Sequence, residues 1–282
     1  MKAAMRFVLL LALAAAPVLA ARAGPGLPTE CAAPADLVTT EAQLPRLGAA
    51  LRGRDPVRVI VLGTGSAEGA VPREDAARYG AEIDALPGRA GGNGSAATTA
   101  RIPGASPDAA WPARLGAALQ AAHPGRRIEL AVIARAGAGT AELRRIVESD
   151  VLRQSPALLV WQIGIADARL GRSVPEFGAD IEAGLARLAA RRIDVVLVDM
   201  QYGANTALFI NTAPYRAYLR WIARSHELPY FRRYELMQHW FENGSFDLHP
   251  DDIATARAER QRMDACVGGQ LAALIADALD PP

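Results

Sequence analysis

The chain alternates short, continuous apolar runs with longer segments in which apolar residues recur every three or four positions. Four runs rich in β-branched residues predict buried strands, at 57–63, 128–134, 157–163 and 193–199. A period near 3.6 predicts helices at 111–122, 140–152, 175–190, 214–225 and 250–279. Apolar strands alternating with helices are typical of a parallel sheet covered on both faces. We therefore predict a single α/β domain with three layers, α/β/α, over residues 57–282. Gly268 and Gly269 are expected to weaken the last helix in its middle.

The overall composition is that of an ordinary globular protein. Hydrophobic residues make up 51% and charged residues 22%, and 31 basic against 30 acidic residues give a formal net charge of +1. This balance argues against a dedicated nucleic-acid or anionic-membrane surface, because such surfaces need many uncompensated basic residues. Lys2 is the only lysine, so chemistry that needs a lysine amine elsewhere in the chain is excluded. The pair Arg232 and Arg233 predicts a solvated or carboxylate-paired surface.

The first 23 residues have the pattern of a secretory signal. Lys2 and Arg6 precede an apolar run at 7–20, which is shorter than the ~20 residues that a membrane-spanning helix needs. Ala21 and Ala23 then form the Ala-x-Ala pattern of a cleavage site. We expect an exported protein, periplasmic or extracellular, with an N-terminal extension at 24–56 and no transmembrane segment after signal cleavage. An uncleaved N-terminal anchor is the alternative.

The chain has two cysteines, Cys31 and Cys266. In an oxidising compartment an isolated pair favours a disulfide over two free thiols. Closing so long a loop stabilises a protein by up to about 5 kcal/mol in the chain-entropy model. Two cysteines are too few for a zinc site, and no His-Glu-x-x-His pattern occurs. We therefore predict a disulfide between Cys31 and Cys266 and no metal site.

A segment rich in Gly, Ala, Ser and Thr separates the first predicted strand from the first predicted helix. With the residues before it, this segment forms a long insertion around 70–110 that has no hydrophobic periodicity. Connections of this length are usually functional lids or mobile insertions. The composition favours a mobile insertion, and a lid over the site stays the alternative.

Candidate chemistry is expected in the loops that follow the strands, because open parallel sheets bind ligands at the carboxyl ends of their strands. The first strand ends in a glycine-rich turn at 63–69, and Gly137 and Gly139 follow the second strand. Glu68 stands where a dinucleotide-binding turn has its third glycine. An acidic side chain there would repel phosphate, so we predict no nucleotide and no other cofactor.

The order of these blocks resembles the SGNH (GDSL) hydrolase superfamily over residues 57–279. The resemblance rests on the block layout and on the linking segments 111–115, 158–164 and 228–233. It implies a flavodoxin-like sheet and the hydrolysis of esters such as lipids, acyl thioesters or acetylated sugars. In that superfamily a serine follows the first strand, a glycine and an asparagine bind the oxyanion, and an Asp-x-x-His motif precedes the last helix.

Two functional positions of the superfamily are kept in this chain, and the nucleophile is displaced. Gly137 matches the oxyanion glycine, and His249 matches the catalytic histidine. Gly65 stands at the place of the nucleophilic serine, so Ser66 lies one residue later. A one-residue shift on a turn moves a side chain by roughly 3.8 Å and changes its direction. Ser66 is then either the nucleophile on a rebuilt turn or a helix-capping residue.

The other two departures affect the oxyanion site and the orienting acid. Ala166 replaces the asparagine, and the loss of one oxyanion donor typically lowers turnover by about 10²–10³. Phe246 stands at the place of the aspartate, and Asp247 lies one residue closer to His249. Asp247 is either the acid that orients His249 or a turn former.

These residues predict an SGNH-type ester hydrolase that acts on a small ester or an acylated saccharide. If the protein is catalytically active, Ser66 is the nucleophile, His249 the base and Asp247 the acid that orients the histidine. The backbone N–H groups of Ser66 and Gly137 are the expected oxyanion donors. Three simultaneous departures favour impaired catalysis, and the alternative is a non-catalytic protein of this fold that binds an envelope glycan or another acylated ligand. The sequence leaves the oligomeric state open.

Overall fold

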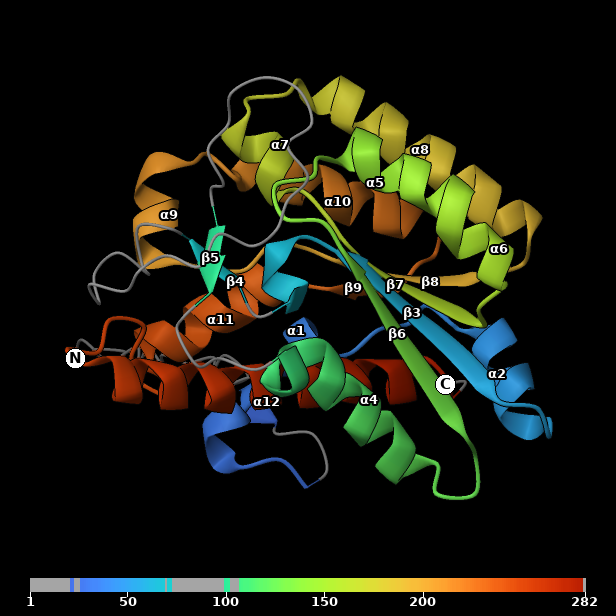
Figure 1. Ribbon diagram of the computed structural model, residues 1–282, viewed down its shortest axis with the longest axis horizontal. Coiled ribbons are helices and arrows are strands. Elements are labelled where there is room, and N and C mark those ends of the chain that lie inside the picture. Colours follow the sequence, from blue (N-terminus) through green and yellow to red (C-terminus); the bar gives the residue numbers. More distant parts are fainter. Residues whose placement is uncertain (1–20, 23–25, 69, 73–98, 102–106, 281–282) are drawn as a thin grey trace, which may run out of the picture.

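The computed structural model describes the chain in five stretches: residues 21–22, 26–68, 70–72, 99–101 and 107–280. Most of the expected signal segment and of the expected 70–110 insertion lies outside these residues. Within them, a central parallel sheet is covered by helices on both faces (Figure 1). The predicted three-layer α/β fold is therefore confirmed.

The central sheet has five parallel strands in the spatial order β6-β3-β7-β8-β9. Their bounds are β3 Val57–Gly63, β6 Ile128–Ala134, β7 Leu158–Gln162, β8 Asp194–Val198 and β9 Tyr230–Phe231. The first four agree with the predicted strands to within one residue at each end. The fifth was not predicted, because two residues are too few to give a hydrophobic pattern.

Each strand supplies side chains to two separate cores. In β3, Val57, Val59 and Val61 face one core, while Ile60 and Leu62 face the other. The first core is covered by α1 (Ala35–Val38), α2 (Pro45–Arg52), α4 (Trp111–Ala122) and α12 (Ile253–Asp277). The second is covered by α5 (Thr140–Ile146), α6 (Leu152–Gln154), α8 (Val174–Ala190) and α10 (Ala213–Ser225). Helices on both faces explain why the strands are apolar along their whole length.

The C-terminal helix α12 is continuous through Gly268, contrary to the expected weakness in its middle. A Cβ atom at Gly268 would lie 2.7 Å from Leu115 N and 2.8 Å from Trp111 O, both backbone atoms of α4. The glycine thus lets α12 and α4 pack with their backbones in close approach, and this packing compensates for its low helix propensity. Asp252 caps the helix by accepting hydrogen bonds from Ala254 N and Thr255 N, each at 2.9 Å.

The N-terminal extension is part of the same core. Cys31 and Cys266 form the predicted disulfide, with a Cα–Cα distance of 5.1 Å, and join the extension to α12. Leu47 N donates a 2.8 Å hydrogen bond to Asp194 Oδ2 at the start of β8. Residues 26–56 therefore pack on the same face of the sheet as α4 and α12.

Shorter elements complete the described structure. The predicted helix at 140–152 is α5 followed by a π-helical turn, η4 (Val147–Val151), and α6. Three more helices follow the later strands: α7 (Ile165–Arg169), α9 (Ala204–Phe209) and α11 (Arg233–Glu242). Two small antiparallel pairs join β1 (Ala21–Arg22) to β2 (Ala33–Pro34) and β4 (Ala70–Pro72) to β5 (Thr99–Arg101). None of the helices in the described ranges has both the length and the apolar character to cross a membrane.

Candidate active site

The predicted site lies where the strand order of the sheet reverses. β6 pairs with one edge of β3 and β7 with the other, so the carboxyl ends of β3 and β7 flank the crevice in which doubly wound folds bind ligands. Gly63 ends β3 against Gln162, the last residue of β7. A Cβ atom at Gly63 would lie 2.8 Å from Gln162 Oε1, closer than a side chain tolerates. Glycine therefore allows this polar side chain to reach the end of β3.

Ser66 lies directly after β3, on the short 3-10 helix η2 (Gly65–Glu68), and is only 6% exposed. Its Oγ accepts one hydrogen bond from Gln162 Nε2 at 2.7 Å and a second from Arg233 Nη1 at 3.1 Å. Both partners are donors. Among the described residues, no base therefore contacts the hydroxyl to remove its proton, which nucleophilic catalysis by serine requires.

Arg233 is the first residue of α11 and is fully buried. The predicted solvated or carboxylate-paired environment is therefore wrong for Arg233, although it holds for Arg232, whose Nη1 lies 3.0 Å from Asp36 Oδ2. The Arg233 guanidinium instead lies 5.5 Å from the centroid of the Trp111 ring. Burial, and then the positive charge of Arg260, lowers the pKa of Arg233 to about 9.

His249 and Asp247 lie in the loop before α12 and are not joined through the imidazole. Asp247 Oδ1 accepts a 2.7 Å hydrogen bond from the backbone N–H of His249, which is the geometry of a turn-forming aspartate. The His249 ring packs edge-on to Phe241, with ring centroids 6.3 Å apart. Within the described chain, no hydrogen bond links the imidazole to Ser66 or to Asp247. The structure thus places these residues without assembling the predicted triad.

Gly137 lies in the turn after β6 with a φ of +75°, a conformation that glycine adopts without strain. Ala138 N donates a 3.1 Å hydrogen bond to Arg135 O, which closes the turn. Arg135 N donates a 3.0 Å hydrogen bond to Gly63 O and holds the start of the turn beside the end of β3. This location agrees with the oxyanion role that the resemblance implies, and the role itself stays a prediction.

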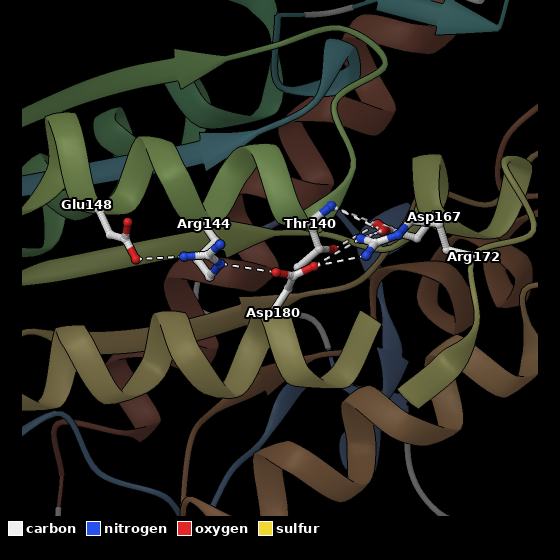
Figure 2. Close-up of polar contacts among 6 residues, drawn as sticks. All are labelled: Thr140, Arg144, Glu148, Asp167, Arg172 and Asp180. Atoms are coloured by element: carbon white, nitrogen blue, oxygen red, sulfur yellow. Dashed lines mark hydrogen bonds and ion pairs between the residues drawn. The ribbon is translucent and has the colours of Figure 1, made fainter. Parts of the chain in front are cut away.

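The position of the superfamily asparagine is held by Ala166, which offers no side-chain donor. The next residue, Asp167, is 1% exposed and faces the turn after β6 (Figure 2). Its Oδ2 accepts hydrogen bonds from Thr140 N at 3.0 Å and from Thr140 Oγ1 at 2.8 Å. A carboxylate occupied in this way cannot replace the missing amide as an oxyanion donor.

Asp167 belongs to a chain of ion pairs that ties α5, α7 and α8 together (Figure 2). Arg172 Nη1 lies 3.1 Å from Asp167 Oδ1 and also donates to Asp180 Oδ2 at 3.1 Å. Arg144 Nε lies 3.1 Å from Asp180 Oδ1, and its Nη1 lies 2.8 Å from Glu148 Oε1. Burial disfavours the charged form of Arg172, yet its hydrogen bonds to Asp180 and Asp167 raise its pKa above the usual range. This network fixes the loop that carries Gly139 and Thr140.

Asp199 follows β8 and is a second buried ionisable group at this edge. Burial raises its pKa to about 7, although hydrogen bonds from Tyr234 N and Tyr230 OH, each at 2.9 Å, oppose the shift. No arginine forms an ion pair with Asp199 among the described residues. This carboxyl group therefore titrates near neutral pH.

The residues with the closest contacts at the site were missed by the sequence interpretation. Gln162 was detectable as the polar last residue of an otherwise apolar strand. Asp167 was detectable because it follows Gly164 in a loop after a strand. Nothing in the sequence distinguishes Arg233 from its solvated neighbour Arg232, because only the packing of α11 against the sheet separates them.

No set of side chains in the described ranges has the composition of a metal centre, since no three His, Cys, Asp or Glu residues gather closely enough. At this edge of the sheet, hydrogen bonds instead join the buried polar side chains of Ser66, Gln162 and Arg233. This arrangement provides hydrogen-bond donors and a cation, which suit an oxygen-rich ligand.

Comparison with known proteins gives a family and a fold. Residues 93–281 match the model of the non-GDSL lipase-like family, a match that begins after Ser66. No curated protein sequence matches the chain. An alpha/beta hydrolase from the metagenome of Lake Arreo, Spain, is similar in structure, with a TM-score of 0.50 and 16% identity over 78% of this chain and 98% of that one. The lipase/acylhydrolase from Enterococcus faecalis also gives a TM-score of 0.50 at 16% identity, over 75% of this chain and 93% of that one.

The family match covers well over half of the chain, and the structural matches reproduce its α/β fold over most of its length. The resemblance to the SGNH superfamily is thereby confirmed at the level of family and fold. The chain belongs to the non-GDSL lipase-like family.

Proposed function

We propose that this protein is an exported SGNH-type ester hydrolase with impaired catalysis, which binds a small ester or an acylated saccharide at the carboxyl edge of its sheet. The observation that carries the proposal is the environment of Ser66. Its hydroxyl follows the first strand, as in the superfamily, but it accepts hydrogen bonds from Gln162 and Arg233 and contacts no base. Binding groups are therefore present, while the group that would activate the nucleophile is not in place.

The missing oxyanion donor adds to this deficit. Ala166 supplies no side-chain amide, and the loss of one oxyanion donor typically lowers turnover by about 10²–10³. Turnover by Ser66 requires the loop that carries His249 to bring the imidazole within about 2.6–3.2 Å of the hydroxyl. Asp247 binds the backbone N–H of His249 and not its imidazole ring, so Asp247 does not orient the ring. Catalysis is then expected to be slow.

Export is supported by two features. The N-terminal segment has the composition of a secretory signal, and the disulfide between Cys31 and Cys266 is of a kind that persists in oxidising compartments. Periplasmic fractionation followed by N-terminal sequencing tests this part of the proposal. A mature chain that begins near Gly24 is expected, and a full-length chain that stays in the membrane fraction would overturn it.

A non-catalytic binding protein is the second candidate, and the double acceptor role of the Ser66 hydroxyl favours it. Its ligand would be an envelope glycan or another acylated molecule. Under this hypothesis Ser66 orients Arg233 and Gln162 and forms no covalent bond with the ligand. The two candidates differ in one measurable property, which is Ser66-dependent turnover.

Hydrolysis of short-chain p-nitrophenyl esters separates the candidates. We expect turnover that is slow but above the rate in buffer, and its loss in Ser66→Ala and His249→Ala. His226→Ala is the matched control and should keep the wild-type rate, because His226 lies away from the crevice in a surface pair with Glu182 at 2.7 Å. Turnover at the buffer rate, together with no labelling by a fluorophosphonate probe, would exclude the hydrolase and leave the binding protein.

A further inference from the structure

Arg233 is a buried cation that forms no ion pair with a carboxylate in the part of the chain that the structure describes. Its guanidinium is fully buried, and its single hydrogen bond within the described chain goes from Nη1 to the neutral Ser66 hydroxyl. The two acids whose charges act on Arg233, Asp264 and Asp199, are engaged elsewhere. Asp264 Oδ2 lies 2.9 Å from Arg260 Nε, and Asp199 accepts hydrogen bonds from two tyrosines. A buried charge in such surroundings costs several kcal/mol unless a partner compensates for it.

The free N–H groups of Arg233 point to the kind of partner that is missing. Nε and Nη2 have no hydrogen-bond partner among the described residues. These two nitrogens share one edge of the planar guanidinium, and their N–H bonds form the fork that binds a carboxylate through both of its oxygens. Nη1, on the far end, is held by Ser66. The serine thus positions the guanidinium and leaves the fork unoccupied.

A second arginine on α12 adds to the positive charge. Arg260 is close enough to lower the pKa of Arg233 by repulsion, and its Nη2 is also buried without a partner. Asp264 balances one of these two charges through its pair with Arg260. One positive charge stays uncompensated, and an anion near both arginines would relieve the repulsion between them.

We propose that Arg233 and Arg260 form an anion-binding site beside Ser66, which takes a carboxylate group of the ligand. The site deepens the proposed function, on which it rests, by assigning an acidic group to the ligand bound at this edge. The ligand carboxylate accepts hydrogen bonds from Nε and Nη2 of Arg233 and lies within reach of the charge of Arg260. Because Arg233 is fully buried, access requires the turn that carries Ser66 to move.

Thermal unfolding in the presence of simple anions tests this site without any need for catalysis. Purified mature protein is heated in sodium acetate, sodium phosphate or sodium chloride at equal ionic strength. We expect acetate to raise Tm saturably, by about 5 °C at one hundred times its Kd, and chloride to have no such effect. Arg233→Met and Arg260→Met should each abolish the rise. Arg220 on α10 is half-exposed and pairs with Glu235 of α11, so Arg220→Met should retain the rise.

The outcomes separate this site from the proposed function. Equal Tm values in all three salts, or an acetate response that survives in Arg233→Met, would overturn the anion site. A saturable response to phosphate alone would overturn its assignment to a carboxylate. Ser66→Ala provides a second probe if Arg233→Met fails to fold, and it should weaken acetate binding at least tenfold by freeing the guanidinium. Ester turnover is measured separately, so either result can fail without the other.

Discussion

Two polar clusters lie at the carboxyl edge of the same sheet, and they differ in how fully their charges are paired. Around Asp167 each buried or half-buried charge has an opposite charge in contact, and the pKa of Arg172 is raised. Around Arg233 the buried cation has no carboxylate in contact among the described residues, and burial together with the charge of Arg260 lowers its pKa to about 9. We call the first group, Thr140, Arg144, Glu148, Asp167, Arg172 and Asp180, the closed network, and Arg233 with Ser66, Gln162, Asp199 and Arg260 the open cluster. Paired charges stabilise the fold, whereas an unpaired buried charge marks a place where a ligand can bind.

The largest effect is expected at the centre of the closed network. Asp167→Ala removes the acceptor for Thr140 N and leaves Arg172 without one of its carboxylates. Breaking a buried pair should lower the free energy of unfolding by about 4 kcal/mol, measured by urea denaturation. Asp150→Ala is the matched control, because it removes an exposed pair with Arg153 and should cost less than about 1 kcal/mol. Equal losses in both variants would contradict the contrast between the clusters.

The closed network and the open cluster also differ in how well the sequence predicts them. The strands and long helices follow from hydrophobic periodicity, which depends only on local sequence and was confirmed within a few residues. The disulfide followed from the cysteine count and the expected compartment. The catalytic geometry did not follow, because whether Ser66 contacts His249 or Arg233 depends on how residues 167 or more positions apart are packed. Periodicity carries no information about such contacts.

Asp199 gives the open cluster a dependence on pH. Its pKa rises from 3.8 in the unfolded chain to about 7 in the folded protein, so the folded state binds the extra proton between these values. The stabilisation of the folded state by this extra proton is fully present below pH 3.8 and is lost as the pH rises through 7. Urea denaturation of Asp199→Asn across pH 4–8 should show a correspondingly smaller decline than the wild type. Parallel curves for the two proteins would show that Asp199 is not the titrating group.

Replacing the central arginine of each cluster tests the comparison directly. Arg172→Met leaves Asp167 and Asp180 without their shared cation and should cost about 2 kcal/mol. Arg233→Met removes a buried charge that no carboxylate contacts among the described residues, and it should leave the free energy of unfolding unchanged or raise it. Urea denaturation of both variants in chloride buffer measures the difference. A larger loss for Arg233→Met than for Arg172→Met would show that Arg233 is a structural residue.

The smallest effect is expected at the outer end of the closed network. Arg144→Gln removes the pairs with Glu148 and Asp180, but Asp180 keeps both of its hydrogen bonds from Arg172. Since no buried charge loses its last partner, the free energy of unfolding should fall by about 0.5–1 kcal/mol. The double variant Arg144→Gln with Arg172→Met should then lose more than the sum of the two single losses, because Asp180 loses its last cation. If the losses of unfolding free energy in the double variant are additive, the ion pairs act independently and do not form a coupled network.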